Sequence, residues 1–187
     1  CFDIHASNIF LREIPQVRIN ELCKDTLLPY AKRLNIDYVW VHGAATVLEA
    51  TFAHSLNMIG TSVLVVEMGV GMRMTKEYCK QLVDGIFVEM KDLGMWQGEV
   101  ITPKDPLIST DGEVHYLNAG YAGIFLPTVE HWTNVKKGDK IGEILDPLEG
   151  VVKEELYSEC DGILFTLREY PVVSEGSLIG RILEGQA

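Results

Sequence analysis

A histidine and a glutamate stand at the ends of runs that read as strands. His5 closes the segment Asp3-Ile4-His5, and Glu67 closes the apolar run 62–67. In an α/β domain, the carboxyl ends of the strands meet at the edge where ligands bind. Neutral imidazole is a common zinc ligand that a neighbouring carboxylate can orient, and a carboxylate that opens onto a glycine-containing loop suits a general base. The two residues are therefore candidates for metal binding and for acid–base chemistry.

Each of these residues also has a plainer interpretation. One histidine does not make a metal site, so Asp3-Ile4-His5 taken alone favours a surface or capping histidine. A carboxylate buried at a strand end is costly unless it is paired or functional. However, a Glu67 that simply points to water is an equal alternative. The residue types at these two positions leave both questions open.

Three further residues are candidates for binding a substrate that carries a carboxylate. Arg12 and Arg18 flank Pro15, and arginine holds carboxylates in a bidentate fork. His42 follows the strand-like run 37–41 and would line the same sheet edge. For each of the three, a solvent-exposed side chain without a role is the alternative that residue type alone favours.

Alternating strand and helix patterns predict the α/β domain that positions these residues. Runs of β-branched and other apolar residues indicate strands, and apolar residues at helical spacing indicate helices, two of them followed by a terminating glycine. Strand and helix in alternation predict a layered sheet domain over residues 1–97. The strands are expected at 37–41 and 62–67, and the helices at 19–34, 46–58 and 75–93.

The pattern changes after residue 97. Residues 98–112 contain two prolines and few periodic apolar positions, which predicts a linker. Over 113–187, short β-type runs alternate with Gly, Asp and Pro, and the spacing Val-x-x-Gly-x-x-Ile-Gly-x-Ile-Leu starts both at Val135 and at Val173. Two such half-repeats predict a small all-β module like the barrel-sandwich hybrid of biotinyl and lipoyl domains.

Composition excludes several classes of partner. The 187 residues carry a net charge of −11, and an acidic surface repels the phosphate backbone of nucleic acids. The longest apolar run, 61–66, is far shorter than the ~20 residues of a membrane span. The four cysteines match no CxxC motif and predict reduced thiols. We therefore expect a cytoplasmic protein that binds neither nucleic acid nor membranes.

Taken in order, these segments resemble one family, the succinylglutamate desuccinylases and aspartoacylases. Residues 3–7, DIHAS, resemble the family's DLH-type segment, whose histidine is the third zinc ligand. Residues 65–69, VVEMG, resemble its ELG-type segment, whose glutamate is the catalytic acid/base. The repeat resembles its appended β domain. The resemblance implies part of a zinc-carboxypeptidase-like layered sheet domain, followed by a barrel-sandwich-like domain.

The resemblance also implies an activity and a cofactor. The implied enzyme is a zinc-dependent amidohydrolase or deacylase that cleaves the amide, or the ester, of a small N-acyl amino acid or related carboxylate. In it, His5 would bind zinc and Glu67 would exchange protons with a zinc-bound water. The family's first two zinc ligands lie in an upstream HxxE motif, which does not occur in these residues. We therefore expect a C-terminal portion of a longer protein, whose N-terminal segment completes the site.

Two other classes of function stay open at this point. A binding or scaffold protein could keep the hydrolase shell without the chemistry, because two zinc ligands are missing from the chain. A biotinyl or lipoyl carrier would modify a lysine between the two half-repeats. Lys153 is the candidate there, although no methionines flank it. The acyl substrate and the oligomeric state, with a homo-oligomer as one candidate, are also open.

Overall fold

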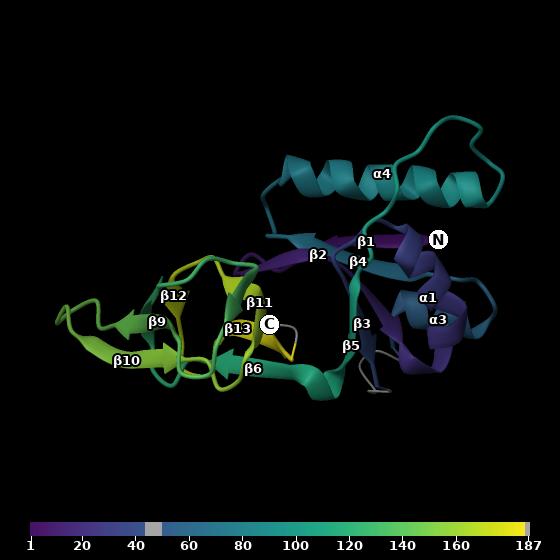
Figure 1. The fold of residues 1–187 in the computed structure, drawn as a ribbon. Coiled ribbons are helices and arrows are strands. Elements are labelled where there is room, and N and C mark those ends of the chain that lie inside the picture. The colour runs from purple at the N-terminus through teal and green to yellow at the C-terminus, as the bar shows by residue number, and fades with distance from the viewer. Residues whose placement is uncertain (44–49, 186–187) are drawn as a thin grey trace. The chain divides into compact units, whose positions relative to one another are not determined.

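The structure is a computed structural model and describes residues 1–43 and 50–185. The chain divides into two compact units, whose elements are labelled in Figure 1. Unit 1 comprises residues 1–6 and 14–111, and unit 2 comprises residues 7–13 and 112–187. The prediction of a mixed α/β chain is confirmed, since helices and parallel strands fill unit 1 and antiparallel strands fill unit 2.

Among the described residues, unit 1 is built on five strands in the order β1-β4-β2-β3-β5. The pairs β1/β4, β2/β3 and β3/β5 are parallel. The strand β2 serves both units, because its residues 11–13 pair with β11 in unit 2 and its later residues pair with β3. The bounds are β1 Phe2–Ala6, β2 Leu11–Asn20, β3 Tyr38–His42, β4 Leu64–Gly69 and β5 Leu107–Thr110.

Helices cover unit 1, and two of them, η1 and α3, begin at a side-chain cap. The Asn20 side chain accepts a hydrogen bond from Leu22 N and begins the short 3-10 helix η1, and the Thr51 hydroxyl caps α3 in the same way. The described bounds are η1 Glu21–Cys23, α1 Lys24–Arg33, α3 Phe52–Met58 and α4 Lys76–Asp92. In the described part of the chain, no helix is long and apolar enough to cross a membrane.

Three expectations about the elements need adjustment. The helix expected over 19–34 starts later, because β2 continues to Asn20, with Val17 and Ile19 buried and Arg18 and Asn20 partly exposed. The first residues of the helix expected over 46–58 fall in 44–49, outside the described residues, and α3 is described from Phe52. The expected linker 98–112 contains β5, which pairs in parallel with β3. The two prolines of this segment obscure the strand pattern in the sequence. The helix expected over 75–93 is confirmed as α4.

The core of unit 1 lies on one face of its sheet. Alternate residues of a strand point to opposite faces, so one face of β2, β3 and β4 packs against the helices α1 and α4. The other face carries the polar side chains described below. The buried cluster consists of Val17, Ile19, Leu27, Ala31, Leu34, Ile36, Val39, Val41, Leu64, Val66 and Leu82.

Unit 2 is built from β-strands in its described residues, apart from the short 3-10 helix η2 (Asp111–Glu113) that leads into it. One set of strands has the order β8-β11-β13-β6, and a second sheet has the order β10-β9-β7-β12, with antiparallel neighbours. The two half-repeats bury equivalent residues and turn at Gly138 and Gly176, both with positive φ. The bounds are β6 Val114–Asn118, β7 Gly123–Pro127, β8 Thr133–Val135, β9 Lys140–Leu145, β10 Val152–Tyr157, β11 Gly162–Arg168, β12 Val172–Val173 and β13 Leu178–Glu184.

The position of Lys153 disfavours the carrier interpretation. Lys153 lies within β10 and not at the tip of the β9–β10 hairpin, where Leu148 is 94% exposed. Its Nζ is 3.3 Å from Asp146 Oδ2 and 3.2 Å from Glu149 Oε2, and these carboxylates raise the pKa of the lysine. An ammonium group held in this way is a poor nucleophile for attachment of a prosthetic group.

The contact between α4 and the end of α1 leads to a stability prediction. A Cβ added at Gly85 would lie 1.9 Å from the Leu34 carbonyl oxygen, so α4 can approach only because residue 85 is glycine. We expect Gly85→Ala to lower the free energy of unfolding by about 3 kcal/mol, since overpacking outweighs the gain in helix propensity. Urea denaturation measures this value. Gly112→Ala is the control, because nothing lies within 4 Å of its added Cβ, and equal stability of the two variants would contradict the prediction.

Candidate functional site

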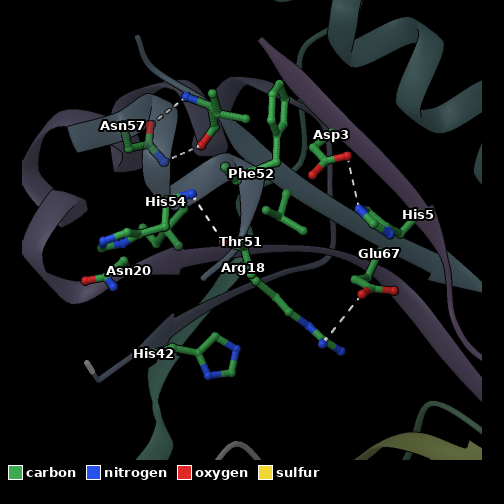
Figure 2. Close-up of a pocket in the computed structure, with 14 residues that line it drawn as sticks. Asp3, His5, Arg18, Asn20, His42, Thr51, Phe52, His54, Asn57 and Glu67 are labelled. Atoms are coloured by element: carbon green, nitrogen blue, oxygen red, sulfur yellow. Dashed lines mark hydrogen bonds and ion pairs between the residues drawn. The ribbon is translucent and has the colours of Figure 1, made fainter. Parts of the chain in front are cut away.

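A cavity of about 420 Å³ opens at the polar face of unit 1 (Figure 2). Its walls come from four strands of the sheet and from α3 with the turn before it. His5 and His42 come from the carboxyl ends of β1 and β3, and the carboxyl ends of strands form the edge at which open α/β sheets bind ligands. The lining residues are Asp3, His5, Arg18, Ile19, Asn20, His42, Thr51, Phe52, Ala53, His54, Asn57, Val63, Val65 and Glu67.

His5 and Glu67 are neighbours across the β1–β4 ladder. The parallel register pairs His5 with Glu67 and Asp3 with Val65, so these side chains share one face of the sheet. His5 Nε2 lies 3.0 Å from Asp3 Oδ1, and both side chains remain partly exposed. This is the orientation of an imidazole by a carboxylate that the sequence pattern suggested.

Glu67 faces an arginine on the adjacent strand. Arg18 Nη1 lies 3.6 Å from Glu67 Oε1, and the exposed fractions of the two side chains are 24% and 17%. The opposite charge offsets the cost of holding the carboxylate in a half-buried position. Arg18 is also the register partner of Trp40 in β3, with its guanidinium carbon 5.4 Å from the centre of the indole ring.

A further carboxylate, Asp111, organises the end of β3. Its Oδ1 accepts a hydrogen bond from Trp40 Nε1 at 2.8 Å and lies 2.9 Å from His42 Nδ1. Its Oδ2 accepts from the backbone N–H of Gly43 at 2.8 Å. The rings of Trp40 and His42 stack with centroids 4.3 Å apart. Sequence reasoning missed Asp111, and the one signal for it was its position directly after the unrecognised strand β5.

Amides and hydroxyls form another part of the cavity wall. Asn57 joins α3 to the start of β4, because its Nδ2 donates to Val63 O at 3.1 Å and its Oδ1 accepts from Val63 N at 2.7 Å. His54 Nδ1 and Asn20 Nδ2 are buried and have no hydrogen-bond partner in the described part of the chain. In the view of Figure 2, these residues lie on the side away from His5 and Glu67. None of them was singled out from the sequence as a site residue.

The structure brings together four of the five residues proposed from the sequence. His5, Glu67, Arg18 and His42 all line the cavity of unit 1. Arg12 is not among its lining residues. It belongs to unit 2, where it lines a separate cavity of about 470 Å³ with residues of β7, β11 and the turns that follow them.

The donor atoms at this site match zinc in part. His5, an imidazole braced by Asp3, has the chemistry of a zinc ligand with its supporting carboxylate. Over residues 1–43 and 50–185, no group of three or more histidine, cysteine, aspartate or glutamate side chains is arranged to hold a metal ion. His5 therefore fits as one member of a ligand set, and the described residues do not provide the rest.

Comparisons with known proteins place this chain by its fold. A scan against protein-family models finds no match, and a search of curated proteins finds none either. Among solved structures, a succinylglutamate desuccinylase from Silicibacter sp. TM1040 superposes with a TM-score of 0.83 at 19% identity. A succinylglutamate desuccinylase/aspartoacylase from Rhodobacter sphaeroides superposes with a TM-score of 0.80 at 21% identity. The product-bound ectoine utilization protein EutE from Ruegeria pomeroyi superposes with a TM-score of 0.82 at 14% identity.

These likenesses extend over the whole of this chain but not over the whole of the similar proteins. They cover 98%, 100% and 98% of this chain, and 57%, 58% and 57% of the respective solved chains. At these identities the likeness establishes the fold. The chain thus has the fold of the corresponding part of the succinylglutamate desuccinylase and aspartoacylase structures, and it spans less than two thirds of their length.

The double hydrogen bond of Asn57 leads to a prediction about the cavity wall. Asn57→Ala leaves the buried backbone of Val63 without its donor and its acceptor, so we expect the free energy of unfolding to fall by about 2 kcal/mol. Ser55→Ala removes only an exposed hydroxyl of the same helix and should change stability by no more than about 0.5 kcal/mol. Chemical denaturation of both variants measures the difference, and an unaltered Asn57→Ala midpoint would exclude this role.

Proposed function

We propose that the chain belongs to the succinylglutamate desuccinylase and aspartoacylase family, and that the whole protein is a zinc-dependent amidohydrolase of small N-acyl amino acids or related carboxylates. One observation carries the proposal. The imidazole of His5, which pairs with the Asp3 carboxylate, is the register partner of Glu67. Both line one cavity, and Glu67 forms an ion pair with Arg18. A metal-binding imidazole next to a carboxylate base is the pair that metal-assisted hydrolysis requires.

In this proposal His5 is one zinc ligand, and the other ligands come from residues outside this chain. A bound zinc ion would polarise the scissile carbonyl and lower the pKa of the attacking water. Glu67 accepts the proton of that water at Oε2, because Oε1 faces the Arg18 guanidinium. It then passes the proton to the nitrogen of the leaving amine, so that water and amide become a carboxylic acid and an amine.

The cavity suits a small, polar substrate. Its volume of about 420 Å³ lies in the range of sites for small molecules, and its lining combines five apolar residues with nine polar or charged ones. In this proposal, His42 and the polar side chains of Asn20 and His54, which line the cavity, contact the oxygen atoms of an acyl amino acid. The four cysteines carry free thiols, which agrees with a cytoplasmic enzyme.

The role of Glu67 predicts a defect in catalysis without a defect in metal binding. Glu67→Gln in the full-length protein keeps the shape of the side chain but removes the proton acceptor. Turnover of N-acyl amino acids should fall by a factor of at least about 100, with zinc content unchanged. Steady-state kinetics with metal analysis test this, with Glu77→Gln on the exposed start of α4 as the matched control. Wild-type turnover by Glu67→Gln would refute the assignment.

The role of His5 predicts a defect in metal binding. The full-length protein should contain about one zinc ion per chain. His5→Ala should lower its zinc affinity by a factor of about 10 to 100 or more, because a ligand is lost. Elemental analysis after dialysis measures this. His115→Ala removes a histidine that pairs with Glu184 in unit 2 and should leave the zinc content unchanged. A wild-type protein without zinc would favour the scaffold alternative.

A further inference from the structure

A row of side chains crosses the sheet of unit 1 from β1 to β5. The β1–β4 register pairs His5 with Glu67, and the β2–β3–β5 registers pair Arg18 with Trp40 and Trp40 with Ser109. The ion pair between Glu67 and Arg18 joins the two halves of the row. Register partners therefore run across the sheet from the candidate base to β5, and the side chains of Glu67, Arg18 and Trp40 are in contact within this row.

Within this row, Arg18 lies between two neighbours, Glu67 on β4 and Trp40 on β3. Its guanidinium lies toward Glu67, as the dashed line in Figure 2 shows, and its carbon lies 5.4 Å from the centre of the Trp40 indole. An aromatic face attracts a guanidinium and gives it a flat support. The Arg18 side chain is only 24% exposed, so neighbouring groups cover most of it. The Trp40 ring is thus a support for the side chain that faces Glu67.

Trp40 is in turn fixed by Asp111. The indole is 2% exposed, and its N–H donates to Asp111 Oδ1 at 2.8 Å. The same carboxylate contacts the His42 ring, which stacks on the indole, and the backbone N–H of Gly43. Asp111 therefore holds both aromatic rings and the end of β3 with two oxygen atoms. Its side chain is 48% exposed and lines no part of the cavity.

We propose that Arg18 is a positioning residue for Glu67, and that Asp111 sets the position of Arg18 through Trp40. The inference rests on the proposed function in one respect, namely that Glu67 is the acid/base. It revises the role that the sequence suggested for Arg18, which was binding of a substrate carboxylate. A guanidinium that already faces Glu67 has its charge largely matched within the protein, so its main effect falls on the base and not on substrate affinity.

The first experiment changes Asp111 and follows both structure and activity. Asp111→Asn keeps the volume but offers only one acceptor oxygen to three donor groups. In the metal-free full-length protein, we expect the Trp40 indole N–H signal, assigned with Trp40→Phe, to shift or broaden in 15N–1H NMR spectra. In the zinc-loaded protein, kcat should fall about tenfold with KM within about twofold, because positioning is lost while binding is kept.

Asp105→Asn is the matched control for this experiment. It makes the same change of charge at an exposed position just before β5, and it should leave both the indole signal and kcat as in the wild type. An Asp111→Asn protein with an unchanged indole signal and an unchanged kcat would overturn the proposal. The NMR measurement does not depend on the reaction, so it tests the link from Asp111 to Trp40 even if Glu67 is not the base.

The second experiment separates positioning from substrate binding at Arg18. Arg18→Met removes the charge, and Arg18→Lys keeps it on a side chain that still reaches toward Glu67. Positioning predicts a fall of about 100-fold in kcat for Arg18→Met, a small change in KM, and partial rescue by Arg18→Lys. A large rise in KM with kcat preserved would assign Arg18 to the substrate and overturn the inference. Activity retained in Glu67→Gln would instead refute the proposed function itself.

Discussion

The parallel pairing of β1 with β4 is the constraint on which the candidate site depends. It sets His5 opposite Glu67, and the alternation of side chains along both strands sends the pair to the same face. A shift of one residue in this register would turn the two side chains to opposite faces. Leu64 and Val66 prevent such a shift, because they alternate with Val65 and Glu67 and are buried in the core on the other face. The apolar core therefore aligns the polar site.

The polar face is stable because its charged groups have partners of matching chemistry. Asp3 lies beside His5, and Arg18 lies beside Glu67. The Asp111 carboxylate accepts hydrogen bonds from donor groups at the end of β3. A half-buried charge without such a partner would cost free energy that the apolar face would have to offset. The contacts of Arg18 with Glu67 and with Trp40 join neighbouring strands. The arrangement that makes the sheet stable is thus the same arrangement that orients the candidate base.

Fold and function rest on different evidence in this protein. Solved structures at 14% to 21% identity share the fold, and one fold can carry several chemistries. The functional proposal depends on His5 and Glu67, because an imidazole beside a carboxylate is a chemical statement that a fold alone does not make. Unit 2 shows the same distinction. Its repeat resembles a carrier domain, but Lys153 is placed in a strand and paired with two acidic residues.

Features that depend on neighbouring residues could be read from the sequence by itself. They include the apolar run that becomes β4, the helix α4 before Gly94 and the repeated turns at Gly138 and Gly176. His5 and Glu67 belong to this group as well, since a polar residue within an apolar run is visible in local sequence, although β4 continues past the expected end at Glu67 to Gly69.

Tertiary structure decided what lies opposite these residues. Arg12 and Arg18 lie on the same strand β2 and looked equivalent in the sequence, but pairing with β11 places the first in unit 2 and pairing with β3 places the second at the cavity. Asp111 meets its three partners across about 70 positions of sequence. Contacts of this range follow from strand order and register, and strand order and register are determined only when the whole sheet packs.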